Sequence, residues 1–146
     1  MRSYQLFLIE EEFASHYFGR ERMFYQLFRE HSHSMGEMKS IISRQIDYIT
    51  KPIPVLRIHQ FLHQQMSKLK GFRAEQGIYY YVMPHSKSTA TLKVHDRWLL
   101  VESQGNHDAE TVFFEVLRKC ETSFLAMDVS AERCGWLKPI KERKFV

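Results

Sequence analysis

The best candidate for metal chemistry in the sequence is a pair of histidines, His59 and His63. At this i, i+4 spacing both imidazoles can face one cation, and neutral imidazole is a common zinc ligand. Two further ligands at a recognisable spacing are missing from the sequence. Because eight histidines among 146 residues produce such a pair easily, we expect no bound metal and no cofactor.

Three consecutive carboxylates, Glu10, Glu11 and Glu12, are the candidates for acid–base chemistry. Consecutive residues cannot share one helical face, whereas acidic residues at a helix start favour the positive end of its dipole. The sequence also lacks the GxGxxG, GxxxxGK[ST], GxSxG and HExxH motifs of nucleotide-binding proteins and hydrolases. We therefore expect no catalytic activity. A small enzyme with a pocket containing His59, His63 and a carboxylate remains an alternative.

The densest basic cluster lies near the C-terminus and comprises Lys138, Lys141, Arg143 and Lys144. With a net charge of +4, it permits a small basic nucleic-acid-binding module, whose affinity would fall steeply with salt. However, Glu142 interrupts the cluster, and no ladder of aromatic residues accompanies it. A solvated tail is the favoured interpretation, and the nucleic-acid-binding module is the alternative function.

An aromatic segment near the N-terminus is a candidate interaction surface. On a helix over residues 11–18, Phe13, His16 and Tyr17 stand at i, i+3 and i+4 and share one face. A two-turn helix can dock only one narrow face on its own core, and exposed aromatic pairs are typical anchors of protein interfaces. The spacing of these residues, taken alone, favours packing of the aromatic rings in the core over an exposed interface. Gln45 sits beside the apolar stripe of a later helix, where its amide could flank a contact surface.

The sequence predicts a single α+β domain over residues 1–146, and the elements of this domain must position these side chains. The expected helices cover residues 11–18, 20–31, 37–49, 54–69 and 109–120. The expected strands cover residues 2–9, 78–83, 89–95, 98–101 and 123–128. They predict a mixed or antiparallel sheet of about five strands packed by helices. Gln104–Asn106 should end the fourth strand, and a basic tail should follow the fifth.

The composition predicts a large core, and the absence of targeting features predicts a protein that works inside the cell. The 44% hydrophobic and 14% aromatic residues exclude a wholly disordered chain. No apolar run approaches the ~18 residues of a membrane span, and the apolar N-terminal stretch is too short for a signal peptide. The two cysteines form no CxxC motif, so we expect free thiols in a cytoplasmic protein. The large side chains expected to be buried are Phe7, Phe24, Phe28, Ile42, Leu62, Phe113 and Leu125.

Five long segments of the sequence resemble the SirA family of sporulation inhibitors of replication. They are EEFASHYFGRE at 11–21, QIDYITKPIP at 45–54, AETVFFEVL at 109–117, FLAMD at 124–128 and ERCGWLKPIKERKFV at 132–146. These segments keep their order over nearly the whole chain, and residues from about 68 to 107 resemble the family least. Such long, non-repetitive strings are far more specific than a short catalytic motif.

The resemblance implies an inhibitor and not an enzyme. Proteins of this family bind the N-terminal domain of the replication initiator DnaA and prevent it from acting at the origin after commitment to sporulation. The resemblance implies a contact surface that includes Phe13, Tyr17 and Gln45, and helical geometry adds Tyr48 at i+3 from Gln45. The two aromatic rings of the short helix should then pack on the partner and not on the core.

The same resemblance implies a monomer that forms a heterodimer with the DnaA domain, without direct contact to nucleic acid or membrane. Ser15 and Asp47 depart from the commoner residues of the family, which could tune the affinity or the choice of partner species.

Overall fold

The structure is a computed structural model that describes residues 1–16 and 19–137. Its helices in chain order are α1 Glu11–His16, α2 Glu21–His33, α3 Gly36–Ile49, α4 Val55–Met66 and α5 Asp108–Cys120. Its strands are β1 Arg2–Ile9, β2 Thr50–Lys51, β3 Phe72–Glu75, β4 Ile78–Val82, β5 Ser88–Val94, β6 Leu99–Gly105, β7 Phe124–Asp128 and β8 Arg133–Trp136. The described helices overlap the predicted ones, although α2 extends to His33 and α4 ends at Met66 rather than near Leu69. Residues 17 and 18, predicted as the end of the first helix, lie outside the described residues.

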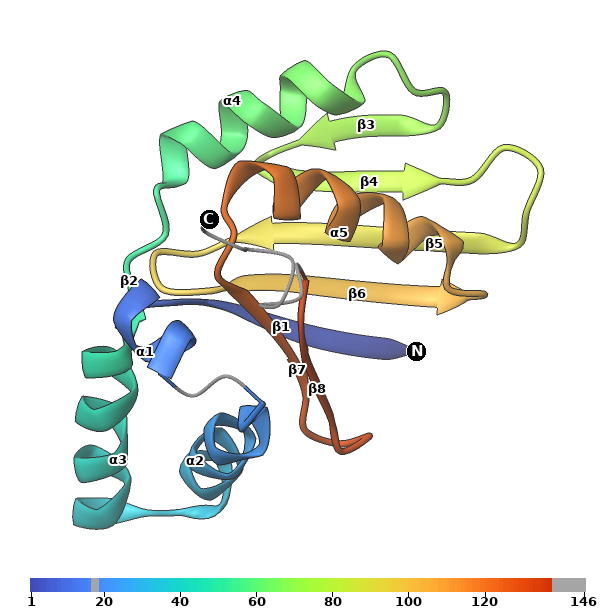
Figure 1. Ribbon diagram of the computed structural model, residues 1–146. Coiled ribbons are helices and arrows are strands. Elements are labelled where there is room, and N and C mark those ends of the chain that lie inside the picture. The colour runs from blue at the N-terminus through green and yellow to red at the C-terminus, as the bar shows by residue number, and fades with distance from the viewer. Residues whose placement is uncertain (17–18, 138–146) are drawn as a thin grey trace.

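The strands of the described chain form one antiparallel sheet with the order β3-β4-β5-β6-β1-β7-β8, and β2 pairs with the end of β1 (Figure 1). The central strand β1 pairs Leu6 with Leu99 of β6 on one side and with Ala126 of β7 on the other. The α+β prediction is confirmed. The predicted number of about five strands is wrong, because β2, β3 and β8 bring the sheet to eight strands within the described residues.

The two outer strands owe their formation to contacts with neighbouring elements. β3 is joined to β4 by a turn in which Gln76 and Gly77 both have positive φ, 50° and 80°, as tight hairpins require. In β8, the Trp136 ring packs edge-on against Phe24 of α2, and its Nε1 donates a hydrogen bond to Glu21 Oε1 at 3.1 Å. The expected basic tail after β7 therefore begins as a strand as far as the structure describes it.

Strand β6 is longer than expected. It extends to Gly105, whereas the predicted strand ended at residue 101. Gly105 has φ +83° and lies directly against the backbone of Lys87. A Cβ atom at this position would be 1.8 Å from the Lys87 carbonyl oxygen, so only glycine fits there.

The side chains of β1 face two hydrophobic clusters on opposite sides of the sheet. Tyr4, Leu6 and Leu8 belong to a cluster that also contains buried residues of α4 and α5. Phe7 and Ile9 belong to the other cluster, which is covered by α1, α2 and α3 (Figure 1). Both faces of β1 are therefore buried.

All seven large side chains expected in the core are buried, with exposed fractions between 0% and 8%. On α3, Ile42 and Ile46 are buried, whereas Met38 near the start of the helix is 58% exposed. In the part of the chain described here, no helix is long and apolar enough to cross a membrane.

Candidate protein-binding surface

The short helix α1 is held in place by its ends. Before it, the Glu10 amide donates to the Ile49 carbonyl at the end of α3, with an N···O distance of 2.8 Å. The Glu11 carboxylate accepts a hydrogen bond from the Ser123 hydroxyl, and Ala14 is fully buried. A six-residue helix is unstable in isolation, so these contacts determine where its side chains point.

Helix α3 is anchored at its C-terminal end by Thr50 and Arg97. The Thr50 hydroxyl donates to the Ile46 carbonyl at 2.8 Å. Arg97 Nη2 donates to the Asp47 carbonyl at 3.1 Å and to Thr50 Oγ1 at 2.9 Å. A cation at this position also interacts favourably with the negative end of the helix dipole. The anchored end carries Gln45 and Tyr48.

The two anchored helices bring predicted site residues together. The rings of Phe13 and Tyr48 meet edge to face, with 5.4 Å between their centroids and an interplanar angle of 65°. Tyr48 remains 74% exposed, and Gln45 on the preceding turn is also exposed. Phe13 is half-buried and packs against the cluster of α1–α3, so the expectation that it avoids the core is wrong in part. Tyr17 lies outside the described residues.

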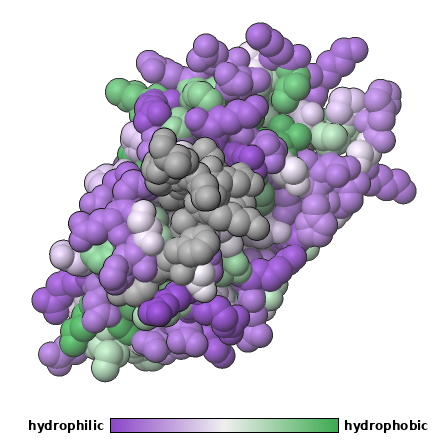
Figure 2. Space-filling view, viewed as in Figure 1, coloured by the Kyte–Doolittle hydropathy of each residue, from purple (hydrophilic) through white to green (hydrophobic). Residues whose placement is uncertain are grey.

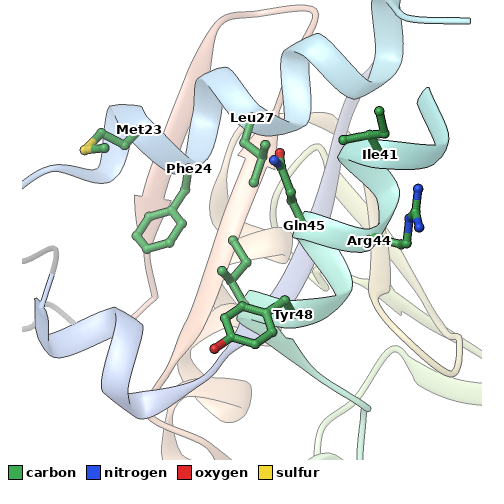
Figure 3. Close-up of a pocket in the computed structure, with 8 residues that line it drawn as sticks. Met23, Phe24, Leu27, Ile41, Arg44, Gln45 and Tyr48 are labelled. Atoms are coloured by element: carbon green, nitrogen blue, oxygen red, sulfur yellow. The ribbon is translucent and has the colours of Figure 1, made fainter. Parts of the chain in front are cut away.

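A groove runs between α2 and α3 beside these rings, and we call it the α2–α3 groove. It has a volume of about 790 Å³. Its apolar walls and polar edge are formed by Met23, Phe24 and Leu27 of α2 and by Ile41, Gln45 and Tyr48 of α3. In Figure 3, Leu27 and Gln45 point toward each other across the gap between the helices. Arg44 is the one charged side chain among the residues that line this groove.

Exposed apolar side chains are concentrated on the same two helices and the loop between them. Five of the nine large apolar residues that are exposed in the described chain lie there, namely Met23, Met35, Met38, Ile41 and Tyr48. Figure 2 shows a mostly hydrophilic face with green atoms in several places, one of which is the lower left, over α2 and α3. Such a concentration of exposed apolar groups is typical of a protein-binding surface.

The surface contains residues that the sequence analysis did not single out. Met23, Leu27 and Ile41 line the groove. The sequence analysis had selected only aromatic residues and Gln45 for this surface. The available signal was position: Met23 of α2 and Ile41 of α3 each precede a buried residue of the same helix and extend its apolar stripe toward solvent.

The two histidines considered for a metal site lie elsewhere, on α4. The His59 Nδ1 atom is hydrogen-bonded to the Tyr79 hydroxyl, and the His63 ring packs edge-on against the ring of Tyr79. Burial, with a smaller contribution from His63, lowers the pKa of His59. Within the described residues, no group of three or more His, Cys, Asp or Glu side chains is arranged to hold a metal ion.

The other charged candidates have structural surroundings or lie beyond the described chain. Glu11 and Glu12 occupy the first turn of α1, as their predicted interaction with the helix dipole requires. Cys120 and Cys134 are free thiols, which agrees with the sequence prediction. The basic residues between 138 and 144 fall outside the described part.

Comparison with known proteins agrees with the resemblance seen in the sequence. Residues 2–141 match the model of the family described as "Sporulation inhibitor of replication protein SirA". The chain is 43% identical over 147 residues to the protein of that name from Bacillus subtilis (strain 168), and the match covers 99% of each chain. On these findings the chain belongs to the SirA family.

Proposed function

We propose that this protein inhibits the initiation of DNA replication during sporulation by binding the N-terminal domain of the initiator DnaA. The binding surface consists of Phe13 on α1, Gln45 and Tyr48 on α3, and the adjoining α2–α3 groove. Tyr17 belongs to it by resemblance. The protein acts by occupying its partner and carries out no catalysis.

The observation that carries this proposal is the coincidence of two independent indications. Resemblance and helical geometry select Phe13, Gln45 and Tyr48, of which Phe13 lies more than thirty positions before the other two. In the structure Phe13 lies against Tyr48, and Gln45 and Tyr48 line the α2–α3 groove. The Bacillus subtilis relative is named a sporulation inhibitor of replication, which supports the same function.

The chemistry of the surface suits a protein partner. Tyrosine combines a large apolar area with a hydroxyl, and aromatic residues near the centre of an interface carry much of its binding energy. The Gln45 amide can both donate and accept hydrogen bonds at the edge of the groove. Apolar walls with a polar edge resemble the core and rim of a specific interface.

The test is a calorimetric titration of the full chain with the isolated DnaA N-terminal domain from the same organism. We expect Tyr48→Ala to weaken binding by ~2 kcal/mol or more, about thirtyfold, as for a central aromatic anchor. Gln45→Ala should cost ~1 kcal/mol, unless it leaves a buried group of the partner unsatisfied. Leu56→Ala is the matched control, because Leu56 is 77% exposed but lies on α4.

Thermal unfolding of the same variants separates binding from folding. Tyr48→Ala and Gln45→Ala should melt close to the unmodified protein, because both side chains are exposed. Phe13→Ala should lower both the affinity and the melting temperature, since its ring is half-buried. Equal affinities for Tyr48→Ala and Leu56→Ala would show that the surface has been wrongly assigned.

A further inference from the structure

A second cavity lies on the other side of α3 from the α2–α3 groove, and we call it the inner cavity. It lies between α2, α3 and the face of the sheet around β1, it opens to solvent beside Asp47, and its volume is about 350 Å³. From α3 it is lined by Ser43, Ile46 and Asp47, whereas the groove uses Ile41, Arg44, Gln45, Tyr48 and Ile49. The two spaces therefore share no residue of α3.

One wall of the inner cavity is aromatic. Phe7 and Phe28 have ring centroids 4.2 Å apart, and Trp98 continues this wall at 6.5 Å from Phe7. Flat rings pack against such a wall through dispersion and offset stacking. A volume of about 350 Å³ is at the small end of the ~300–1,000 Å³ range of ligand pockets, so it suits one or two fused rings.

Opposite charges stand side by side at the cavity. Arg97 Nη2 lies 3.8 Å from the Asp47 carboxylate, and both residues line the cavity. A cation beside an anion gives no net charge, so the pair does not favour a charged ligand. It favours a neutral group that accepts a hydrogen bond from the guanidinium and donates one to the carboxylate.

Arg97 also has a hydrogen-bond donor without a partner. Its Nη2 atom is occupied by the Thr50 hydroxyl and by the carbonyls of Asp47 and Thr50. Its Nε atom is buried and makes no hydrogen bond, and it is the one such side-chain atom in the described chain. Buried donors are nearly always paired, so Nε can still donate to an acceptor that reaches it.

We propose that the inner cavity binds a small, flat, neutral heterocycle in which an N–H group adjoins a carbonyl, the lactam edge found in free nucleobases. The ring packs on Phe7, Phe28 and Trp98. The carbonyl accepts from the Arg97 guanidinium, which turns slightly to present Nε, and the N–H group donates to the Asp47 carboxylate. Binding of the DnaA domain is not required for this site.

The experiment is a nuclear magnetic resonance titration of the isotope-labelled full chain with hypoxanthine. The matched probe is 1-methylhypoxanthine, which has nearly the same ring system but whose lactam N–H is replaced by N–CH₃. We expect saturable shifts of the Trp98 indole and Arg97 Nε–H signals with hypoxanthine. The methylated probe should bind about tenfold more weakly or worse, because one charge-assisted hydrogen bond is lost.

Variants show whether the Arg97–Asp47 pair is responsible. Arg97→Gln and Asp47→Asn should each weaken hypoxanthine binding by about tenfold. Asp47→Asn is included because the Asp47 side chain is 68% exposed and its change leaves the Arg97 contacts with Thr50 in place. Arg73→Gln is the control for loss of a positive charge, since Arg73 lies on the edge strand β3.

Three results would overturn the proposal. The first is equal binding of hypoxanthine and its methylated form, and the second is shifts that do not saturate or that fall outside the inner cavity. The third is unchanged hypoxanthine binding in both Arg97→Gln and Asp47→Asn. Each would mean that the cavity holds water only.

Discussion

Replacing Arg2 by Met is expected to destabilise the fold strongly, because Arg2 is the partner of the buried Glu110 carboxylate. Arg2 Nε and Nη2 donate to Glu110 Oε1 at 2.8 and 2.6 Å. Its Nη1 and Nη2 atoms also donate to the carbonyls of Gly105 and Asn106, both at 2.8 Å. The Arg2 side chain is 19% exposed and that of Glu110 is 2% exposed.

The expected cost follows from this difference in burial. Breaking a fully buried pair by removing one partner costs ~3–5 kcal/mol, because the remaining charge is left without compensation. Water can reach the space left by the partly exposed Arg2, so we expect the lower end, ~3 kcal/mol. For a protein of this size, that lowers the melting temperature by about 6–12 °C.

The pH dependence distinguishes this mechanism from a simple loss of packing. Burial raises the pKa of Glu110, but hydrogen bonds from Arg2, Tyr4 and Ser103 outweigh it, and the net pKa is lowered. A lowered carboxyl pKa stabilises the fold above the unfolded value of ~4.3, and this stabilisation is lost as the pH falls through the folded value. In the Arg2→Met variant, no arginine lowers the pKa of Glu110 in this way. The deficit of the variant should therefore shrink as the pH falls through the folded pKa of Glu110, because protonation removes the charge that Arg2 compensates.

The assay is urea unfolding of the unmodified protein, Arg2→Met and the control Arg73→Met at pH 7 and near pH 3. Arg73 pairs with Glu75 on the surface, where both side chains are about 60% exposed, so its removal should cost under ~1 kcal/mol. A loss for Arg2→Met that is equal at both pH values, or no larger than that of Arg73→Met, would refute the reasoning.

Further predictions concern the core, a backbone contact and a thiol. Phe113→Ala should cost ~3–5 kcal/mol in denaturant unfolding, because its side chain is fully buried; a loss below that of Arg73→Met would contradict it. Gly105→Ala should destabilise by more than Gly77→Ala, since both have positive φ but only Gly105 also abuts backbone. Burial raises the pKa of Cys134 to about 11, so iodoacetamide at pH 8 should label it much more slowly in the folded than in the urea-unfolded protein.

Local sequence patterns predicted the fold where burial and periodicity agree. The apolar run at residues 2–9 predicts a strand, and β1 lies inside the sheet with Leu6 and Phe7 in opposite hydrophobic clusters. β8 carries no such pattern. Its Gly135 weakens a strand, and Trp136 is held by Glu21 and Phe24, which are distant in sequence. Strands that depend on such tertiary contacts cannot be recognised from local propensity.

The candidate surface was predictable from the sequence only in part. The aromatic spacing and the SirA-like segments singled out Phe13, Gln45 and Tyr48. The α2–α3 groove depends on how two helices pack, and the sequence gives no crossing angle or separation for them. Met23 and Leu27 thus became part of the surface only through the fold.

The central claim is that α1, α3 and the α2–α3 groove bind the DnaA N-terminal domain. The most direct measurement is a nuclear magnetic resonance titration of the isotope-labelled chain with that domain, unlabelled. We predict that the signals of Phe13, Gln45 and Tyr48 change on binding, while those of Leu56 and of β3 stay unchanged. Binding that perturbs β3 or α4 and leaves Gln45 and Tyr48 unaffected, or the absence of binding, would contradict the claim.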